Sequence, residues 1–417
     1  MSTPVRSERP VPITIGRVFK RLGPGIVSGA SDNDPTTVAT LAIVGASTIY
    51  GLAWLVLLVI PMLAVVQAIA ARIGVASKRG LEDCIRTRYG RGLALAALFA
   101  VLAVNVITLA ADLEGGGAAL QIITGIDYRW FVVPFAGLAA AALIIGKNDS
   151  ITNVLKYLTI VFFAYIATAF FAHPDWLVVL RGSLVPHFEN NKAYISGAIA
   201  LLGTTLTSYA YVWETVETSE KRQPIRRIGL VQAEAIVGIV FAGIVFWFIV
   251  VATGATLGVH HKMVETAQDA AVALVPIAGK YASFVFGFGL LASAMIAVPV
   301  LAGTSAYVMA EAFGWRRSLD ASFARADRFY WTLIASLAVG AAIALVGFSP
   351  IKLLFFSGIA GGIATPFTLG LMMLVGRSRR IMGENRLGVA LTTAGWCVTT
   401  VVSIAAIVYL VQTARGE

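Results

Sequence analysis

The residues whose types could do chemistry gather in the first long apolar stretch, residues 23–50. There the segment Ser31-Asp32-Asn33-Asp34-Pro35-Thr36-Thr37 introduces two carboxylates and a proline. At membrane depth a carboxylate costs roughly 2.5–3.5 kcal/mol even on insertion-based scales, so it indicates function. Proline lacks an N–H, and the carbonyls before it therefore lose their helical partners. A broken helix that carries a carboxylate predicts a cation site, with Asp34 as its charged ligand.

A second interruption lies in the sixth apolar run, in Gly203-Thr204-Thr205-Leu206-Thr207-Ser208-Tyr209. If the two interruptions face each other at mid-membrane, they present the Asp34 carboxylate, the hydroxyls of Thr37 and Thr207, and the freed carbonyls of Ser31 and Thr204. These oxygens are hard donors, which suit Mg²⁺, Mn²⁺ or Ca²⁺ rather than ions that recruit thiolate or imidazole. Each hydroxyl also has a structural interpretation, because Ser and Thr in membrane helices mediate helix packing.

Membrane-spanning helices must position these residues. Of the 417 residues, 58% are hydrophobic and only 13% are charged, which is typical of a polytopic all-α membrane protein. Apolar runs of suitable length predict eleven transmembrane helices. Their expected ranges are 24–45, 52–73, 93–123, 130–145, 151–172, 194–213, 230–257, 281–309, 329–346, 353–375 and 387–411.

The placement of Lys and Arg predicts the orientation of the chain. Of these 32 residues, 25 lie in the loops that become cytoplasmic if the N-terminus is inside. We therefore expect a cytoplasmic N-terminus, an external C-terminus and a multi-pass protein of the inner (plasma) membrane. The net charge of +10 then needs no nucleic acid, because these cations lie beside the lipid bilayer and meet its anionic headgroups. No cleaved signal peptide is expected.

The two broken helices predict an internal repeat. Five spans separate the starts of the first and sixth spans, so these two cross the membrane in opposite directions. This pattern is typical of a five-plus-five inverted repeat with an eleventh helix appended. The expected organisation is a single transporter domain, 23–412, between a cytoplasmic tail, 1–22, and a short tail, 413–417. Within it we expect one repeat at about 23–172, the second at about 193–376, and helix 11 at about 387–411.

Several function classes are disfavoured. No G-x-x-x-x-G-K-[ST] phosphate loop occurs, so ATP-driven pumping by this chain alone is disfavoured. The chain is not expected to be an enzyme. Cys84 and Cys397 are too far apart in the expected topology for a disulfide. The histidines fall in outward loops without another metal ligand at a recognisable spacing. Secondary transport or a channel remains, with no cofactor.

Four acids supply a candidate proton or ion pathway: Asp32, Asp112, Glu114 and Glu214. A buried acid in a membrane helix can relay protons. Asp112 and Glu114 are two residues apart on a helix and so point to different sides. Glu214 begins an i, i+3, i+6 series with Glu217 and Glu220, for which a solvated face is favoured over a cation exit path. Passive transport and proton symport stay open as equal alternatives.

At this point the segments resemble a known family. From Gly23 to Leu410 the chain is similar to the Nramp family of divalent metal transporters, and in particular to its bacterial Nramp-related branches. Asp34-Pro35-Thr36-Thr37 resembles the Asp-Pro-Gly-Asn motif of the family's first helix. Further family-like segments are 67–74, 111–113 with 117–120, 297–303 and Met382-Gly383-Glu384.

The resemblance implies a LeuT-type fold and the import of a divalent metal by alternating access, with the ion held between the first and sixth helices. Asp34 matches the ligating aspartate of the family, and Thr37 stands where the family has a ligating asparagine. Thr207 stands where typical members have methionine. Ser31 and Thr204 match positions whose backbone carbonyls contribute. A monomer is expected.

Departures from the family pattern bear on the substrate. Typical members read Met-Pro-His where this chain reads Thr207-Ser208-Tyr209, so the soft sulfur is missing. In this respect the chain resembles the magnesium-transporting relatives, and the expected substrate is either Mg²⁺ or Mn²⁺. The alternative is a transporter of the same fold that moves an organic cation or an amino acid, with Asp34 binding an ammonium group.

Overall fold

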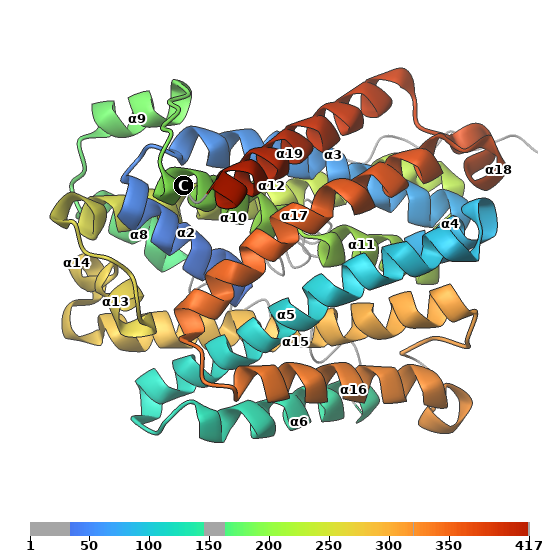
Figure 1. Cartoon of the computed structure of the whole chain (residues 1–417), viewed down its shortest axis with the longest axis horizontal. Coiled ribbons are helices and arrows are strands. Elements are labelled where there is room, and N and C mark those ends of the chain that lie inside the picture. The colour runs from blue at the N-terminus through green and yellow to red at the C-terminus, as the bar shows by residue number, and fades with distance from the viewer. Residues whose placement is uncertain (1–33, 146–162, 320, 416–417) are drawn as a thin grey trace, which may run out of the picture.

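The computed structural model describes residues 34–145, 163–319 and 321–415 (Figure 1). Within these ranges every regular element is a helix and no strand occurs. The predicted all-α membrane fold is therefore confirmed. The expected N-terminal tail, 1–22, and the first part of the first span lie outside the described residues, as do residues 151–162 of the fifth span.

Helices occupy all five spans predicted for the first half of the chain. They are α2 (Pro35–Thr48), α3 (Ala53–Ser77), α5 (Arg91–Thr124), α6 (Arg129–Ile145) and α8 (Phe163–Phe171), with the short α4 (Leu81–Tyr89) between α3 and α5. Of these, α3 and α5 are long and apolar enough to cross a membrane, while α6 is apolar but shorter.

The second half contains helices in the other six predicted spans. They are α10 (Lys192–Thr205) with α11 (Ser208–Glu220), α12 (Ile228–Thr256), α15 (Ala282–Phe313), α16 (Asp327–Ala344), α17 (Pro350–Arg377) and α19 (Val389–Arg415). Short helices between them are α9 (Trp176–Leu184), α13 (Ala267–Val272), α14 (Val275–Ala278) and α18 (Arg379–Met382). Figure 1 shows α5, α15 and α16 running side by side.

The sixth span is broken as the sequence predicts. Helix α10 ends at Thr205 and α11 begins at Ser208. Between them Thr207 has extended backbone, with φ −62° and ψ 142°. The last carbonyls of α10 and the first N–H groups of α11 thus meet inside the protein, where a continuous helix would have paired them.

Helix α2 begins at Pro35, directly after Asp34. The backbone of Asp34 is extended, and its side chain accepts a hydrogen bond from the Thr37 N–H at 2.6 Å. An aspartate at this position satisfies one of the unpaired N–H groups of the first turn. Proline fits the first helical position because its missing N–H would have had no partner there. The Asp-Pro pair thus encodes both the helix start and a carboxylate at its end.

Close packing between α10 and α17 fixes the position of the break in the sixth span. A Cβ atom on Gly203 would lie only 1.9 Å from the carbonyl oxygen of Gly358. One on Gly362 would lie 2.6 Å from the carbonyl oxygen of Ile199. Only glycine allows two helix backbones to approach so closely. These contacts hold the C-terminal end of α10 against α17 and bring Ser357 beside the break.

Candidate functional site

The Asp34 carboxylate lies between the starts of two helices. It is 1% exposed. Its Oδ1 accepts the hydrogen bond from the Thr37 N–H, and its Oδ2 accepts one from the Tyr209 hydroxyl at 2.7 Å. Tyr209 is in the first turn of α11. The Asp34 carboxylate therefore joins the N-terminus of α2 to the N-terminus of α11.

Thr37 joins α2 to the end of α10. Its hydroxyl oxygen lies 3.0 Å from the hydroxyl oxygen of Thr204 and 3.5 Å from the Thr204 carbonyl oxygen. Both residues are buried. Thr204 belongs to the last turn of α10, whose carbonyls have no partner further along the helix. The contact thus brings two hydroxyls and one helix-end carbonyl together beside Asp34.

Thr207 completes the group of oxygens predicted at the breaks. It precedes α11 and is buried, and among the described residues its side chain makes no capping hydrogen bond. Asp34, Thr204 and Thr207 line one small cavity. The other side chains that line it are Thr36, Thr108 and Ser357. The space they enclose is narrower than a water molecule, so a hydrated ion enters only if the helices separate.

The electrostatics of this cavity are mixed. The N-termini of α2 and α11 carry partial positive charge, and the C-terminus of α10 carries partial negative charge. Asp34 supplies the negative charge that offsets the two N-termini. A cation here would gain from that carboxylate and from the carbonyls of the last turn of α10. Among the described residues no group of three or more His, Cys, Asp or Glu side chains forms a metal cluster.

The other predicted site residues are placed as follows. Ser31 and Asp32 lie outside the described residues. Asp112, on α5, is fully buried, and its Oδ1 accepts a hydrogen bond from the Thr36 hydroxyl at 2.9 Å. Its Oδ2 has no hydrogen-bond partner in the part of the chain that is described. Asp112 is thus linked to the start of α2 through Thr36, which is two positions after Asp34.

Glu114 faces a different part of the protein. It is fully buried near the phenol of Tyr128 and the guanidinium of Arg129, between α5 and α6. The structure therefore groups Asp112 with the Asp34 cavity and separates Glu114 from it.

The expected solvated face on α11 is wrong for Glu214, which is only 8% exposed. Its burial follows from the packing of α11 between α3 and α15. Glu217 pairs with Lys221 at 2.6 Å, and Glu220 accepts a hydrogen bond from Tyr307 at 2.9 Å. The three carboxylates do not form one continuous row for a cation.

Sequence reasoning missed a second buried group of charges, at the start of α4. The Asp83 N–H donates to the Glu311 carboxylate of α15 at 3.1 Å. Arg317 lies 3.2 Å from Glu311 and 3.5 Å from Asp83, and Arg86 lies 2.7 Å from Asp83. Neighbouring Glu82 is also buried, and its burial, with the Glu311 carboxylate nearby, raises the pKa of Glu82 to about 9.

Part of this cluster lies in the basic segment 78–91, which is not exposed throughout. Helix α4 forms there, but its first turn is buried against α15. The available signal was the pair Glu82-Asp83 among arginines, together with the acid Glu311 in an apolar run. Neither the Glu82-Asp83 pair nor Glu311 indicated, from sequence alone, which residues it would contact.

Comparison with known proteins agrees with this architecture. The family described as natural resistance-associated macrophage protein-like, Nramp, matches residues 25–412. This chain belongs to the Nramp family. Nramp proteins are transporters rather than enzymes, and the expectation of a non-enzymatic, multi-pass membrane protein is confirmed.

Two relatives named divalent metal cation transporter MntH show how far the Nramp similarity extends. That of Deinococcus radiodurans is 25% identical over 409 residues, covering 94% of this chain and 89% of the relative. That of Chromohalobacter salexigens is 24% identical over 406 residues, covering 95% and 92%. The chain thus spans nearly the full length of these transporters.

Solved structures support the LeuT-type fold of this Nramp protein. A mutant form of a manganese transporter from Eremococcus coleocola superposes with a TM-score of 0.74 at 16% identity, covering 97% of this chain and 88% of that one. MhsT in complex with L-phenylalanine superposes with a TM-score of 0.60 at 14% identity, covering 94% and 98%. At these identities the likeness concerns the fold alone.

Proposed function

We propose that this Nramp protein is a secondary transporter that imports a divalent metal cation, Mg²⁺ or Mn²⁺, by alternating access. The ion binds between α2 and the break that separates α10 from α11. Family membership and the names of the MntH relatives support a divalent cation as the substrate. The Eremococcus coleocola structure, titled a manganese transporter, supports Mn²⁺ as one of the two candidates.

The position of Asp34 is the observation that carries this proposal. The Asp34 carboxylate is buried between the starts of two helices. Thr36, two positions further along the chain, contacts the buried Asp112. A buried carboxylate in a membrane protein indicates function. In our proposal Asp34 supplies the charge that attracts the ion. Oxygens around it complete the coordination: the hydroxyls of Thr37 and Thr207 and the carbonyls of Thr204 and Ser31.

Binding must exchange hydrogen bonds for metal bonds. Both Asp34 oxygens already accept hydrogen bonds, from the Thr37 N–H and the Tyr209 hydroxyl. An ion that binds Oδ2 displaces the tyrosine hydroxyl and so loosens the link between α2 and α11. This exchange couples the ion to the relative position of the two helices, which is what alternating access requires.

The donor set favours hard ions. Carboxylate, hydroxyl and carbonyl oxygens suit Mg²⁺ and Mn²⁺, and Mg²⁺ keeps several of its waters when it binds protein. Among the described residues, neither sulfur nor imidazole lines the cavity. Because these oxygens do not penalise Mg²⁺ as a soft ligand would, we propose that the protein discriminates weakly between the two ions.

Four acids are proposed as a proton or ion pathway: Asp32, Asp112, Glu114 and Glu214. Asp112 is the best placed of the described three, because Thr36 connects it to the start of α2. A protonated Asp112 could donate to Asp34 or to water that enters when the helices separate. Proton symport and passive transport predict different pH changes inside a vesicle, so a pH measurement during uptake separates them.

Orientation and organisation belong to the same proposal. The distribution of Lys and Arg supports a cytoplasmic N-terminus and an external C-terminus in the inner (plasma) membrane. We propose that residues 23–412 form one transporter domain that acts as a monomer.

Flux into proteoliposomes tests the function. Purified protein is reconstituted, and uptake of Mg²⁺ and Mn²⁺ is followed with a pH dye inside the same vesicles. The proposal predicts flux of at least one ion by the wild type and none by Asp34→Ala. Acidification that accompanies uptake supports symport, and uptake without it supports passive transport. Absence of flux for both ions, from folded protein, contradicts the proposal.

An organic substrate is the second candidate. Asp34 is the one carboxylate among the described residues that line the cavity, and a single carboxylate suits an ammonium group as well as a metal. The fold is shared with MhsT, which was crystallised with L-phenylalanine. Uptake of a labelled amino acid or amine, independent of divalent ions and lost in Asp34→Ala, would favour this alternative.

A further inference from the structure

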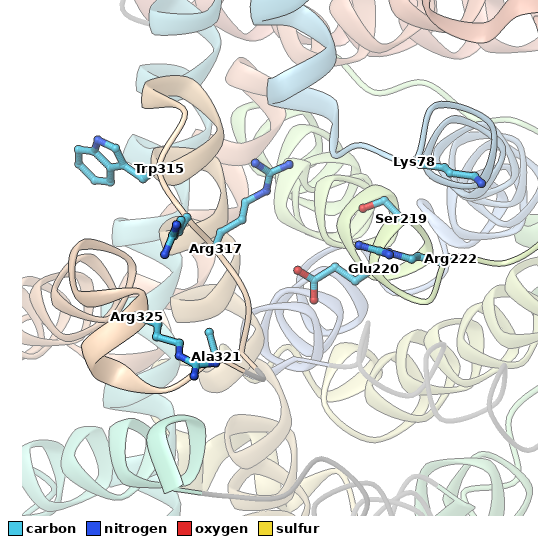
Figure 2. Close-up of a pocket in the computed structure, with 9 residues that line it drawn as sticks. Lys78, Ser219, Glu220, Arg222, Trp315, Arg317, Ala321 and Arg325 are labelled. Atoms are coloured by element: carbon cyan, nitrogen blue, oxygen red, sulfur yellow. The ribbon is translucent and has the colours of Figure 1, made fainter.

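A pocket of about 480 Å³ opens where α3, α11 and α15 end (Figure 2). It shares no lining residue with the Asp34 cavity. The residues that line the pocket come from three separate segments of the chain: Lys78, residues 219–222 and residues 315–325. Its charged side chains are Lys78, Glu220, Arg222, Arg316, Arg317 and Arg325. Among the described residues, five cations and one carboxylate therefore share one concave surface.

Most of these cations are not neutralised by the protein. Within the described ranges Lys78, Arg222, Arg316 and Arg325 form no salt bridge, and all four are exposed. Like charges repel when they gather, and a concave low-dielectric wall concentrates their field. The positive-inside rule explains why the separate loops are basic. It does not explain why three segments bring their cations to the same pocket.

The other charged groups of the pocket have partners. Arg317 pairs with Glu311 and Asp83 beneath it. The carboxylate of Glu220 accepts a hydrogen bond from Tyr307. Figure 2 shows Arg325 and Arg317 approaching from the α15 side, while Lys78 and Arg222 lie on the opposite side with Glu220. An anion between them would be reached from two sides.

The charge decides which occupant fits. A divalent cation is repelled, so this pocket is not part of a metal path. The chain's own N-terminal segment is also unsuitable by composition, because residues 1–22 contain five cations and one acid. Arginine and lysine are the residues that bind phosphate oxygens, arginine through paired N–H donors. The volume is within the range of small-molecule sites and exceeds what a single phosphate fills.

We propose that this pocket is a binding site for a phosphate-bearing anion. Two sources carry that chemistry: a soluble polyphosphate and the headgroup of an anionic lipid. The adjacent Trp315 stacks on Phe313 and lies under Arg328, with the guanidinium carbon 5.6 Å from the ring centroid. Tryptophan is enriched at membrane interfaces, which suits a lipid headgroup, and the exposed cations of the pocket are equally open to a soluble polyphosphate.

Pyrophosphate binding to the purified full-length protein in neutral detergent, without divalent ions, tests the site. The pocket variant is Arg222→Gln with Arg325→Gln, which leaves the Arg317 ion pairs intact. Its matched control is Arg377→Gln with Arg380→Gln, which removes the same charge from exposed positions outside the pocket. We expect the pocket variant to bind about tenfold or more weakly, from the loss of about 1.4 kcal/mol or more, and the control to bind as the wild type does.

A second arm identifies the source of the phosphate. The three proteins are reconstituted in nanodiscs of phosphatidylcholine alone or mixed with phosphatidylglycerol. If the lipid headgroup is the ligand, phosphatidylglycerol should suppress pyrophosphate binding by the wild type. If a soluble polyphosphate is the ligand, phosphatidylglycerol should leave pyrophosphate binding unchanged. Equal weakening in pocket and control variants, or no binding in any medium, overturns the proposal. Arg316→Gln replaces the double variant if the latter melts at a lower temperature.

Discussion

The Tyr209 hydroxyl donates a hydrogen bond to Oδ2 of Asp34 at 2.7 Å, across a sequence separation of 175 residues. It connects the broken sixth span to the start of α2 through the carboxylate that lines the cavity. In the proposed function, the same Asp34 oxygen binds the incoming cation. Ion binding would then require release of this hydrogen bond.

Tyr209→Phe is expected to tighten metal binding. The variant removes the hydroxyl that competes with the ion for Oδ2, and a hydrogen bond to a charged group is worth about 1.5–3 kcal/mol. Part of that energy becomes available to the ion, so we expect Kd for Mn²⁺ to fall by about three- to tenfold. Isothermal titration measures the change. Weaker binding by the variant would instead make the tyrosine hydroxyl itself a ligand.

Thr207→Met is expected to change ion preference. A thioether favours softer ions and offers little to Mg²⁺. Mg²⁺ flux should fall by about tenfold or more relative to Mn²⁺ flux, a selectivity change of about 1.4 kcal/mol. Thr207→Val is the control, since it removes the hydroxyl without adding sulfur. A ratio of Mg²⁺ to Mn²⁺ flux that stays at the wild-type value in both variants would mean that residue 207 does not set the ion preference.

The start of α2 and the break of the sixth span were predictable from sequence because their signals are local. Asp34-Pro35 contains both a capping carboxylate and a residue that starts helices, and Gly203 to Tyr209 interrupts an apolar run with small and hydroxyl residues. Each signal spans only a few neighbouring positions. The sequence placed Thr37 and Thr204 in one candidate site only on the condition that the two interruptions face each other, and the contact between these residues comes from tertiary packing.

The buried charges near α4 were not predictable in the same way. Asp83 and Glu311 are 228 positions apart, and their contact depends on how α4 packs against α15. Glu214 was misplaced for a similar reason, because its burial comes from neighbouring helices rather than from its own spacing. Local patterns indicate which residues are unusual, whereas tertiary packing decides which of them meet.

Glu82→Gln is expected to flatten the pH dependence of stability. Burial raises the pKa of Glu82 from an ordinary value of 4.5 to about 9, so the folded protein holds a proton that the unfolded chain releases. The contribution of Glu82 is therefore fully present below about pH 4.5 and is lost as pH rises toward about 9, by at most about 1.4 kcal/mol per pH unit.

The melting temperature of the purified protein across this pH range measures the effect. The melting temperature of Glu82→Gln should rise relative to that of the wild type as pH rises, because glutamine stays neutral. Asp83→Asn serves as the comparison, since it loses the ion pairs to Arg86 and Arg317 and should melt lower across the whole range. Parallel curves for wild type and Glu82→Gln would show that Glu82 does not titrate there.

Asp112→Asn separates proton movement from ion binding. The amide can still accept the hydrogen bond from Thr36, so the start of α2 should keep its position. If Asp112 relays protons, uptake of Mn²⁺ continues in proteoliposomes while the accompanying acidification is lost. Unchanged acidification would remove Asp112 from the pathway.

The position of the bound ion decides whether Asp34 is the metal ligand. Crystals grown with Mn²⁺ allow the metal to be located by its anomalous scattering. We expect a peak about 2.0–2.6 Å from an Asp34 carboxylate oxygen, within reach of Thr37 and Thr207. This peak should disappear in Asp34→Asn, a variant that keeps the helix cap. A peak elsewhere, for example beside Glu311, or one that persists in Asp34→Asn, would rule out Asp34 as the metal ligand.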